Sequence, residues 1–296
     1  MGNRARWLNV VGSVALAVGL GGCALGGGVP SGDDQAARLV RMGDFAMSQG
    51  DPVTAISLYE QALMMDPTSE EAQRRLAPTQ QSVGAGVSAL DTYRRAAEQS
   101  PDDPLALRRL GNALIAETYP ERAMPYLEKS IALADAPQTR NSLGVAFDML
   151  GQHRQAQEQY RVAMTLAPTD LDLANNLALS MALNGEFDTA IAMAQDVSTT
   201  VGAGSRHRQT FALVLGLAGR ETQAAEVAGM DLSPDQVAAN LEYYQLLRSV
   251  EPSSARAMAI TTGMGAPSDI TQVGLLVDLL HAATTVPGVM IATVPQ

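Results

Sequence analysis

The apolar residues of this chain follow three patterns along its 296 positions. A run of mostly apolar or small residues spans Leu8 to Leu20. In a long central array, small and apolar residues recur at helical spacing. After Glu251 the array pattern ends, and a new helical spacing is seen at Ile270, Val273, Val277 and Leu280. These patterns predict a targeting segment, a helical array and a separate C-terminal tail.

Small residues of the array recur about every 34 positions. The alanines of this series are Ala55, Ala89, Ala123, Ala156, Ala190 and Ala224. A parallel glycine series comprises Gly50, Gly84, Gly151, Gly185 and Gly219, with Thr118 at the one position where glycine is missing. Chance helical periodicity does not maintain a register of this length, so the array predicts repeats of one structural unit.

The 34-residue period resembles that of the tetratricopeptide repeat (TPR), which is a pair of antiparallel helices. The clearest copy begins at Pro137 and carries Leu143-Gly144, Phe147, Gly151, Ala156, Tyr160, Ala163 and Pro168 at the expected offsets. Six copies are expected, at residues 36–69, 70–103, 104–136, 137–170, 171–204 and 205–231. A single pair cannot bury its apolar face, so we expect an all-α, superhelical TPR solenoid. Pro78 is expected to kink or shorten the first helix of the second copy.

A further helix is predicted after the sixth copy. Ser233, Pro234 and Gln236 form the N-cap, first-turn proline and capping-box pattern of a helix start. We therefore expect a capping helix over 234–250 that covers the end of the array, so that the array spans 36–250. Residues 251–296 are expected to form a partly disordered tail with one helix at 269–284.

The start of the chain has the pattern of a secretory signal. Arg4 and Arg6 precede the apolar run, which is too short for a membrane span of about 20 residues. The stretch Leu20-Gly21-Gly22-Cys23 resembles the lipobox of bacterial lipoproteins. That resemblance implies that residues 1–22 are a signal peptide, that cleavage precedes Cys23, and that Cys23 carries a covalent lipid. The alternative, a buried structural thiol, is disfavoured because Cys23 lies among glycines with no amphipathic pattern.

The resemblance also implies a location. Ala24, rather than aspartate, after the cysteine implies an outer-membrane anchor with the protein on the periplasmic face. Residues 23–35 then form a lipidated, glycine-rich flexible tether.

Composition excludes several functions. The net charge of −11 disfavours nucleic acid as a partner. One cysteine forbids an internal disulfide and a cysteine-based zinc site, and the three histidines lack metal-ligand spacing. Neither a nucleophile elbow nor a phosphate-binding loop is present. We therefore expect no enzyme activity, no metal and no cofactor apart from the lipid.

TPR arrays bind segments of other proteins in a concave groove lined by the first helix of each repeat. Carried over by position, the groove residues expected to be exposed are Arg108, Asn112, Asn141, Asp148, Asn175, Arg206 and Gln209. Arg108 and Asn112 resemble half of the carboxylate clamp of some TPR adaptors, whereas Val145 stands where the other half would need asparagine. For each of these residues, the alternative is an ordinary solvated polar face.

Residues 137–250 resemble more closely the TadD proteins of the tight-adherence (Flp) pilus system. The resemblance lies in NSLGVAFDMLGQHRQAQEQYRVAM, NNLALSMALNGEFDTAIAMA, RQTFALVLGLAGRETQAAEVAGMDLS and VAANLEYYQLLRS. It implies a pilotin-like scaffold that helps a pilus secretion machine assemble, with other machine proteins or an outer-membrane secretin as partners. The alternatives are a scaffold for another envelope assembly, such as barrel insertion or polysaccharide export, and a regulator of a periplasmic hydrolase.

Overall fold

A computed structural model describes residues 32–251 and 253–262, and within these ranges it contains only helices. They are α1 (Gly32–Ser48), α2 (Pro52–Met65), α3 (Glu70–Ser82), α4 (Gly86–Gln99), α5 (Pro104–Ala116), α6 (Pro120–Leu133), α7 (Pro137–Met149), α8 (His153–Leu166), α9 (Leu171–Leu183), α10 (Phe187–Thr199), α11 (Ser205–Leu217), α12 (Glu221–Ala228), α13 (Pro234–Ser249) and α14 (Ser253–Thr262). The all-α prediction is confirmed. Cys23 and the helix predicted at 269–284 lie outside the described residues.

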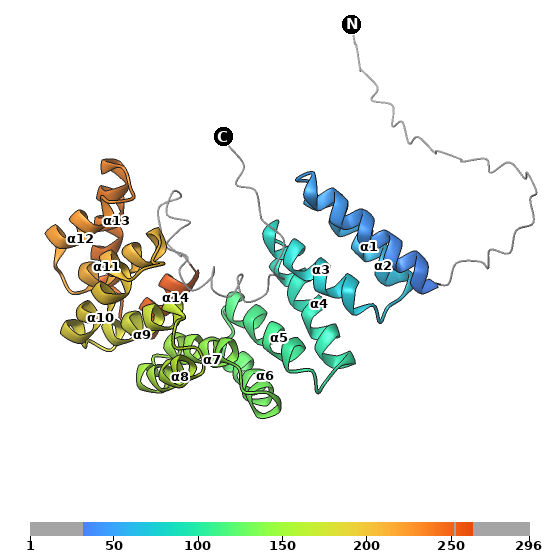
Figure 1. Ribbon diagram of the computed structural model, residues 1–296, viewed down its shortest axis with the longest axis horizontal. Helices are drawn as coiled ribbons and strands as arrows, with labels where there is room; N and C mark the ends of the chain where they lie inside the picture. The colour runs from blue at the N-terminus through green and yellow to red at the C-terminus, as the bar shows by residue number, and fades with distance from the viewer. Residues whose placement is uncertain (1–31, 252, 263–296) are drawn as a thin grey trace, which may run out of the picture.

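The helices pack as successive pairs, and each predicted repeat contains one pair, from α1–α2 to α11–α12. The pairs follow one another along an arc (Figure 1). Consecutive odd-numbered helices contact one another along most of the array, whereas even-numbered helices contact mainly the odd-numbered helices beside them. The first helix of each pair therefore lines the inner, concave face, and the second lies outside. No helix of the described ranges is long and apolar enough to span a bilayer.

The turn inside each pair requires a left-handed residue. The glycine series predicted from the sequence occupies this position with φ between 73° and 81°. The exception is Thr118, which adopts φ 64° although it is β-branched. Such a residue is strained in this region of backbone space. The missing glycine is therefore replaced without any change in the turn.

Close contact between the two helices of a pair depends on a small residue opposite a large one. In the fourth pair, a Cβ added at Gly144 would lie 2.5 Å from the Tyr160 ring, which is fully buried. Gly43 meets Tyr59 in the same way in the first pair. In the fifth and sixth pairs the residues at these two positions are both alanine. Where the first helix has glycine, the residue 16 positions later is therefore large, and in the fifth and sixth pairs, where it has alanine, that residue is small.

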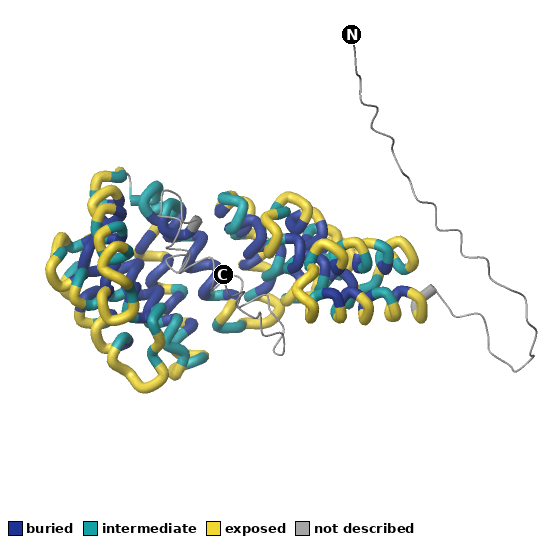
Figure 2. Tube along the Cα trace, turned by 90° about the horizontal axis from the view of Figure 1, so that it is seen from above, coloured by how far each residue is buried: buried dark blue, intermediate teal, exposed yellow. Residues whose placement is uncertain are grey.

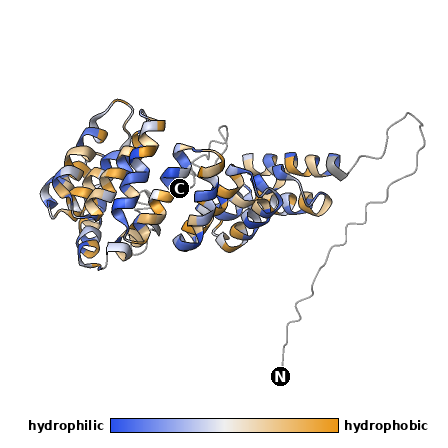
Figure 3. Cartoon of the chain, turned by 90° about the horizontal axis from the view of Figure 1, so that it is seen from below, coloured by the Kyte–Doolittle hydropathy of each residue, from blue (hydrophilic) through white to orange (hydrophobic). Residues whose placement is uncertain are grey.

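The buried apolar residues form two clusters. The smaller joins α1, α2 and the start of α3, and the larger runs from Ala77 in α3 to Ile260 in α14. Figure 2 shows buried residues following the inside of the array, and Figure 3 shows hydrophobic and hydrophilic residues interleaved along the helices. Pro78 lies close to the boundary between the clusters, but α3 is not shortened, because its 13 residues equal those of α5.

The segment after the capping helix departs from the expectation. The sequence predicts no helix between residues 251 and 268, yet α14 spans Ser253–Thr262 and contacts α7, α9 and α13. Its composition, SSARAMAITT, is a weak helix signal. The helix is instead supported by tertiary packing, because Ala257 and Ile260 are fully buried in the larger cluster. The predicted tail has one helix at 269–284, and α14 is a helix that this prediction does not include.

Candidate functional site on the concave face

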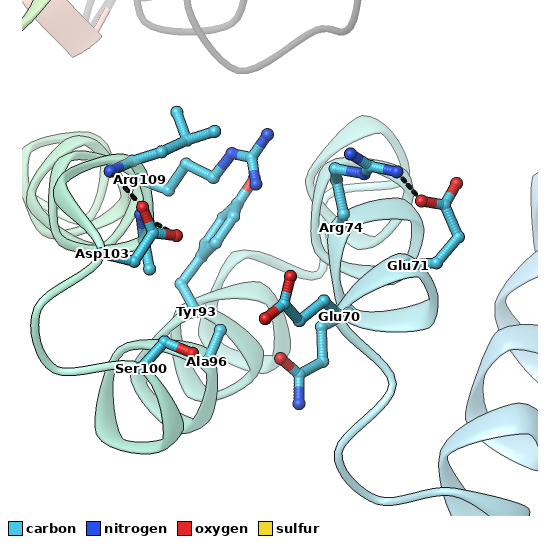
Figure 4. Close-up of a pocket in the computed structure, with 11 residues that line it drawn as sticks. Glu70, Glu71, Arg74, Tyr93, Ala96, Ser100, Asp103 and Arg109 are labelled. Atoms are coloured by element: carbon cyan, nitrogen blue, oxygen red, sulfur yellow. Dashed lines mark hydrogen bonds and ion pairs between the residues drawn. The ribbon is translucent and has the colours of Figure 1, made fainter. Parts of the chain in front are cut away.

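A polar cavity of about 300 Å³ opens between α3, α4 and α5. It lies between two repeats whose first helices, α3 and α5, make little direct contact with each other. Figure 4 shows Arg74 from α3, Tyr93 from α4 and Arg109 from α5 converging on it. Three helices from two adjacent repeats thus contribute side chains to one cavity.

Arg109 is the cation of this cavity for which the described part of the chain provides no hydrogen bond or ion pair. Arg74 pairs with Glu71, and Asp103 accepts hydrogen bonds from the backbone N–H groups of Leu105 and Ala106 at the start of α5. Arg109 forms no hydrogen bond or ion pair with the other residues that line the cavity (Figure 4). Burial lowers the pKa of Arg109, partly offset by nearby Tyr93 and Asp103. A half-buried guanidinium without a bonded partner is suited to binding a carboxylate or a backbone carbonyl.

Arg108 and Asn112 lie one turn apart on the same helix. Within the described residues, Nη1 of Arg108 and both amide atoms of Asn112 are buried without a hydrogen-bond partner. The Asn112 side chain is only 2% exposed, so it is not the open groove residue that the sequence predicts. Leaving such groups unpaired is costly. Val145 on α7 is fully buried, and it offers no polar atom to complete a clamp.

Asn141 and Asn175 make contacts between repeats instead of being exposed. The Asn176 amide donates to Asn141 Oδ1 at 2.8 Å, and Asn175 Nδ2 donates to Thr210 Oγ1 at 2.9 Å. Both asparagines are buried. These bonds join α7 to α9 and α9 to α11. The expectation of exposure therefore fails for both, because the next helix covers them.

Gln209 and Arg206 also bond within the array. Gln209 Nε2 donates to the Ala228 carbonyl at 3.4 Å and to Asp231 Oδ2 at 3.2 Å, and the side chain is 1% exposed. Arg206 is half-buried and pairs with Asp172 of α9. Of the seven predicted groove residues, the structure brings together Arg108 and Asn112 on α5 and commits the others to internal bonds.

Asp148 is the centre of a buried network. It accepts hydrogen bonds from Tyr160 at 3.0 Å and Ser180 at 2.7 Å, and its Oδ1 lies 2.8 Å from His153 Nδ1. His153 Nε2 lies 2.9 Å from the Ser253 hydroxyl of α14. Burial raises the pKa of Asp148, and the three bonding partners oppose that rise. The network therefore ties three repeat helices to α14.

Ser253, His153 and Asp148 are bonded in the order of a hydrolase triad. Their surroundings are instead those of a structural contact that joins α14 to the array, which we call the Ser253 clasp. Ser253 Oγ lies 3.8 Å from the position of a Cβ on Gly151, against the α7–α8 turn. Within the described residues, no group of three histidine, cysteine, aspartate or glutamate side chains could hold a metal ion. The sequence reveals neither this network nor the Arg109 cavity. The one available signal is the adjacent arginine pair on α5 of an acidic chain.

Comparison with known proteins agrees with the helix arrangement. The tetratricopeptide-repeat family profile matches residues 39–71. A tetratricopeptide repeat protein from Parabacteroides merdae ATCC 43184 superposes with a TM-score of 0.62 over 83% of this chain and 98% of that one, at 14% identity. The fold is a tetratricopeptide-repeat solenoid. In TPR terms, α5 and α7 are first helices of adjacent repeats, and their inner faces belong to the groove.

Two further similarities extend the comparison. PilW, described as a widely conserved type IV pilus biogenesis factor, matches with a TM-score of 0.57 over 65% of this chain and 90% of that one, at 20% identity. The uncharacterised protein y4yS of Sinorhizobium fredii (strain NBRC 101917 / NGR234) is 34% identical over 92 residues, 31% of this chain. The matched part of the TPR chain spans about half the length of y4yS.

Proposed function

We propose that this TPR protein is an adaptor that binds a segment of a partner protein on the α5 part of its concave face. The observation that supports this most strongly is the set of uncommitted polar atoms on α5. Nη1 of the partly exposed Arg108 has no hydrogen-bond partner among the described residues, and the partly exposed Arg109 lines the adjacent cavity. A bound peptide would supply the missing acceptors through a carboxylate or its backbone carbonyls.

The partner's chemistry follows from charge. The chain has a net charge of −11, and the adjacent Arg108 and Arg109 form no salt bridge with another described residue, so they form a local positive site. Burial lowers the pKa of both side chains. An approaching carboxylate would offset that desolvation, which favours a partner segment carrying an acidic side chain or a free C-terminus.

We further propose that the adaptor acts at the outer membrane in the assembly of a Flp-type pilus machine. The TadD-like strings over 137–250 support this role. So does the occurrence of the same fold in PilW, whose description names pilus biogenesis. A lipid on Cys23, outside the described residues, would hold the array close to the bilayer through the glycine-rich tether. In this role the protein positions other components and catalyses no reaction.

The groove is tested by charge reversal on α5. Arg108→Glu should abolish recovery of pilus-machine proteins by cross-linking in the native envelope and should abolish pili, with unchanged protein level. The matched control is Arg154→Glu, which reverses an exposed arginine on the outer helix α8. Intact pili in the Arg108→Glu strain would overturn the groove assignment. Recovery of a hydrolase and no pilus component would overturn the pilus assignment.

The anchor is tested separately. Cys23→Ser should abolish acyl labelling and release the protein from the membrane fraction. A serine variant that remains membrane-bound through its own N-terminus would contradict the lipoprotein assignment.

A further inference from the structure

α14 lies on the concave face, not on the outer layer. After the capping helix α13, a regular array would place the next helix outside, as the second member of a pair. Instead α14 packs against α7 and α9, which are both first helices of their repeats. The chain thus turns back and occupies one part of the groove with its own helix (Figure 1).

The apolar side of α14 packs into the array. Ala257, Ile260 and Thr261 are fully buried, and Ala257 and Ile260 belong to the larger hydrophobic cluster. Positions i, i+3 and i+4 form one face of a helix. This is the geometry by which an amphipathic helix binds in the groove of a partner protein.

Polar bonds fix both the position and the direction of α14. At its start, the Ser253 hydroxyl meets Nε2 of His153, whose other ring nitrogen contacts buried Asp148. Arg256 donates to the carbonyls of Leu247 at 2.8 Å and Val250 at 3.0 Å, at the end of α13. Apolar burial and two polar anchors together define a specific binding mode for a helix on this surface.

α14 is also suited to dissociate from the concave face. It has 10 residues, and isolated helices of that length are marginal in water. α13 ends at Ser249 and α14 begins at Ser253, so an undocked α14 remains close to its site. A tether this short gives an effective concentration in the millimolar range. A competing helix must therefore bind more strongly than α14, or arrive after α14 has been displaced.

We propose that α14 is a resident occupant of the TPR groove over α7 and α9, and that a partner helix with the same small and branched face displaces it. This inference rests on the proposed adaptor function and adds a second, regulated part to the site. The α5 part binds through unpaired polar groups, while the α7–α9 part is closed until such a helix replaces α14. Binding at α5 then selects the partner, and displacement of α14 allows the partner helix to bind over α7 and α9.

The test uses the full chain in detergent and a fluorescein-labelled peptide, SSARAMAITT, that reproduces α14. Ile260→Asp places a charge at a fully buried position and should expel the resident helix. If α14 is docked for 90 to 99% of the time, its release raises peptide affinity by about 10- to 100-fold. The matched control is Leu246→Asp, because Leu246 is 52% exposed on neighbouring α13. This control should bind the peptide as weakly as the wild type.

A milder variant keeps the test decisive if Ile260→Asp loses helical circular dichroism. Ile260→Ala should give an affinity between those of the wild type and the aspartate variant. Equal affinity in the wild type, the control and both Ile260 variants would overturn the proposal. Peptide affinity reports only on the α7–α9 part of the groove, because α14 packs against α7 and α9. Failure of the α14 proposal is therefore distinguishable from failure of the adaptor function, which is read by pilus assembly.

Discussion

Gly144→Ala should destabilise the fourth repeat although alanine favours helices. The new Cβ would lie 2.5 Å from Cε1 and 2.7 Å from Cζ of Tyr160. The ring cannot easily move, because it is fully buried and its hydroxyl donates to Asp148 at 3.0 Å. Overpacking of this kind costs about 1–3 kcal/mol. The helix-propensity gain of about 0.5–1 kcal/mol offsets part of this cost, so we expect a net loss of about 1 kcal/mol, and at most about 2.5 kcal/mol.

A double-mutant cycle isolates the contact. Tyr160→Ala alone should cost about 3–5 kcal/mol through the cavity that it leaves. In the double variant the overlap disappears, and the pair becomes the alanine pair present in the fifth and sixth repeats. The two substitutions should therefore be less destabilising together than the sum of the single changes, by about 1–3 kcal/mol.

Repeat arrays do not always unfold in one step, so the assay combines urea unfolding with hydrogen exchange. Exchange should accelerate over α7 and α8 in Gly144→Ala and remain unchanged over α1 and α2, which belong to a separate hydrophobic cluster. Additive single and double effects, or unchanged exchange in α7 and α8, would refute the packing explanation. In the second repeat the same two positions hold Ala77 and Tyr93, so an alanine already faces a tyrosine. There the tyrosine lines a cavity.

Three other predictions follow from single sites. Thr118→Gly should stabilise the protein by about 0.5–1 kcal/mol in urea unfolding, because it relieves the left-handed threonine; an unchanged or lower midpoint would contradict this. The bond from Arg208 lowers the pKa of Asp231, so the stability it contributes is present above the ordinary value of 3.8 and lost as pH falls through the lower folded value. Asp231→Asn should therefore reduce the drop in urea midpoint between pH 7 and pH 3, and an unaltered drop would argue against the pairing. A fluorophosphonate probe should not label Ser253, and labelling that Ser253→Ala abolishes would show that the clasp is a nucleophilic site.

The repeat framework is predictable from sequence because its determinants are local. A left-handed turn residue, a small residue at each helix contact and a capping box leave visible marks at fixed intervals. The helix starts at Pro104, Pro137 and Pro234 coincide with predicted starts for this reason. Even the missing glycine was visible as Thr118, although its left-handed backbone was not.

Groove exposure and α14 were not predictable in the same way, because both depend on contacts between distant segments. The buried Asn175 donates a hydrogen bond to a residue 35 positions away, and the His153–Ser253 contact spans 100 positions. Position within the repeat places Arg108 on the groove side of α5, but it does not reveal which groove positions, such as Asn112, are buried inside the array. A segment with weak helix propensity, such as that of α14, forms a helix only where it packs against another surface of the protein.

The most direct test of the account is photo-cross-linking from the concave face in the native envelope. A photoreactive amino acid at Leu105, which lines the α3–α5 cavity, should capture a pilus-assembly protein. The same amino acid at Glu158, exposed on the outer helix α8, should not capture it. Capture of one partner with equal yield from both positions, or no capture from Leu105 in cells that assemble pili, would contradict binding through the groove.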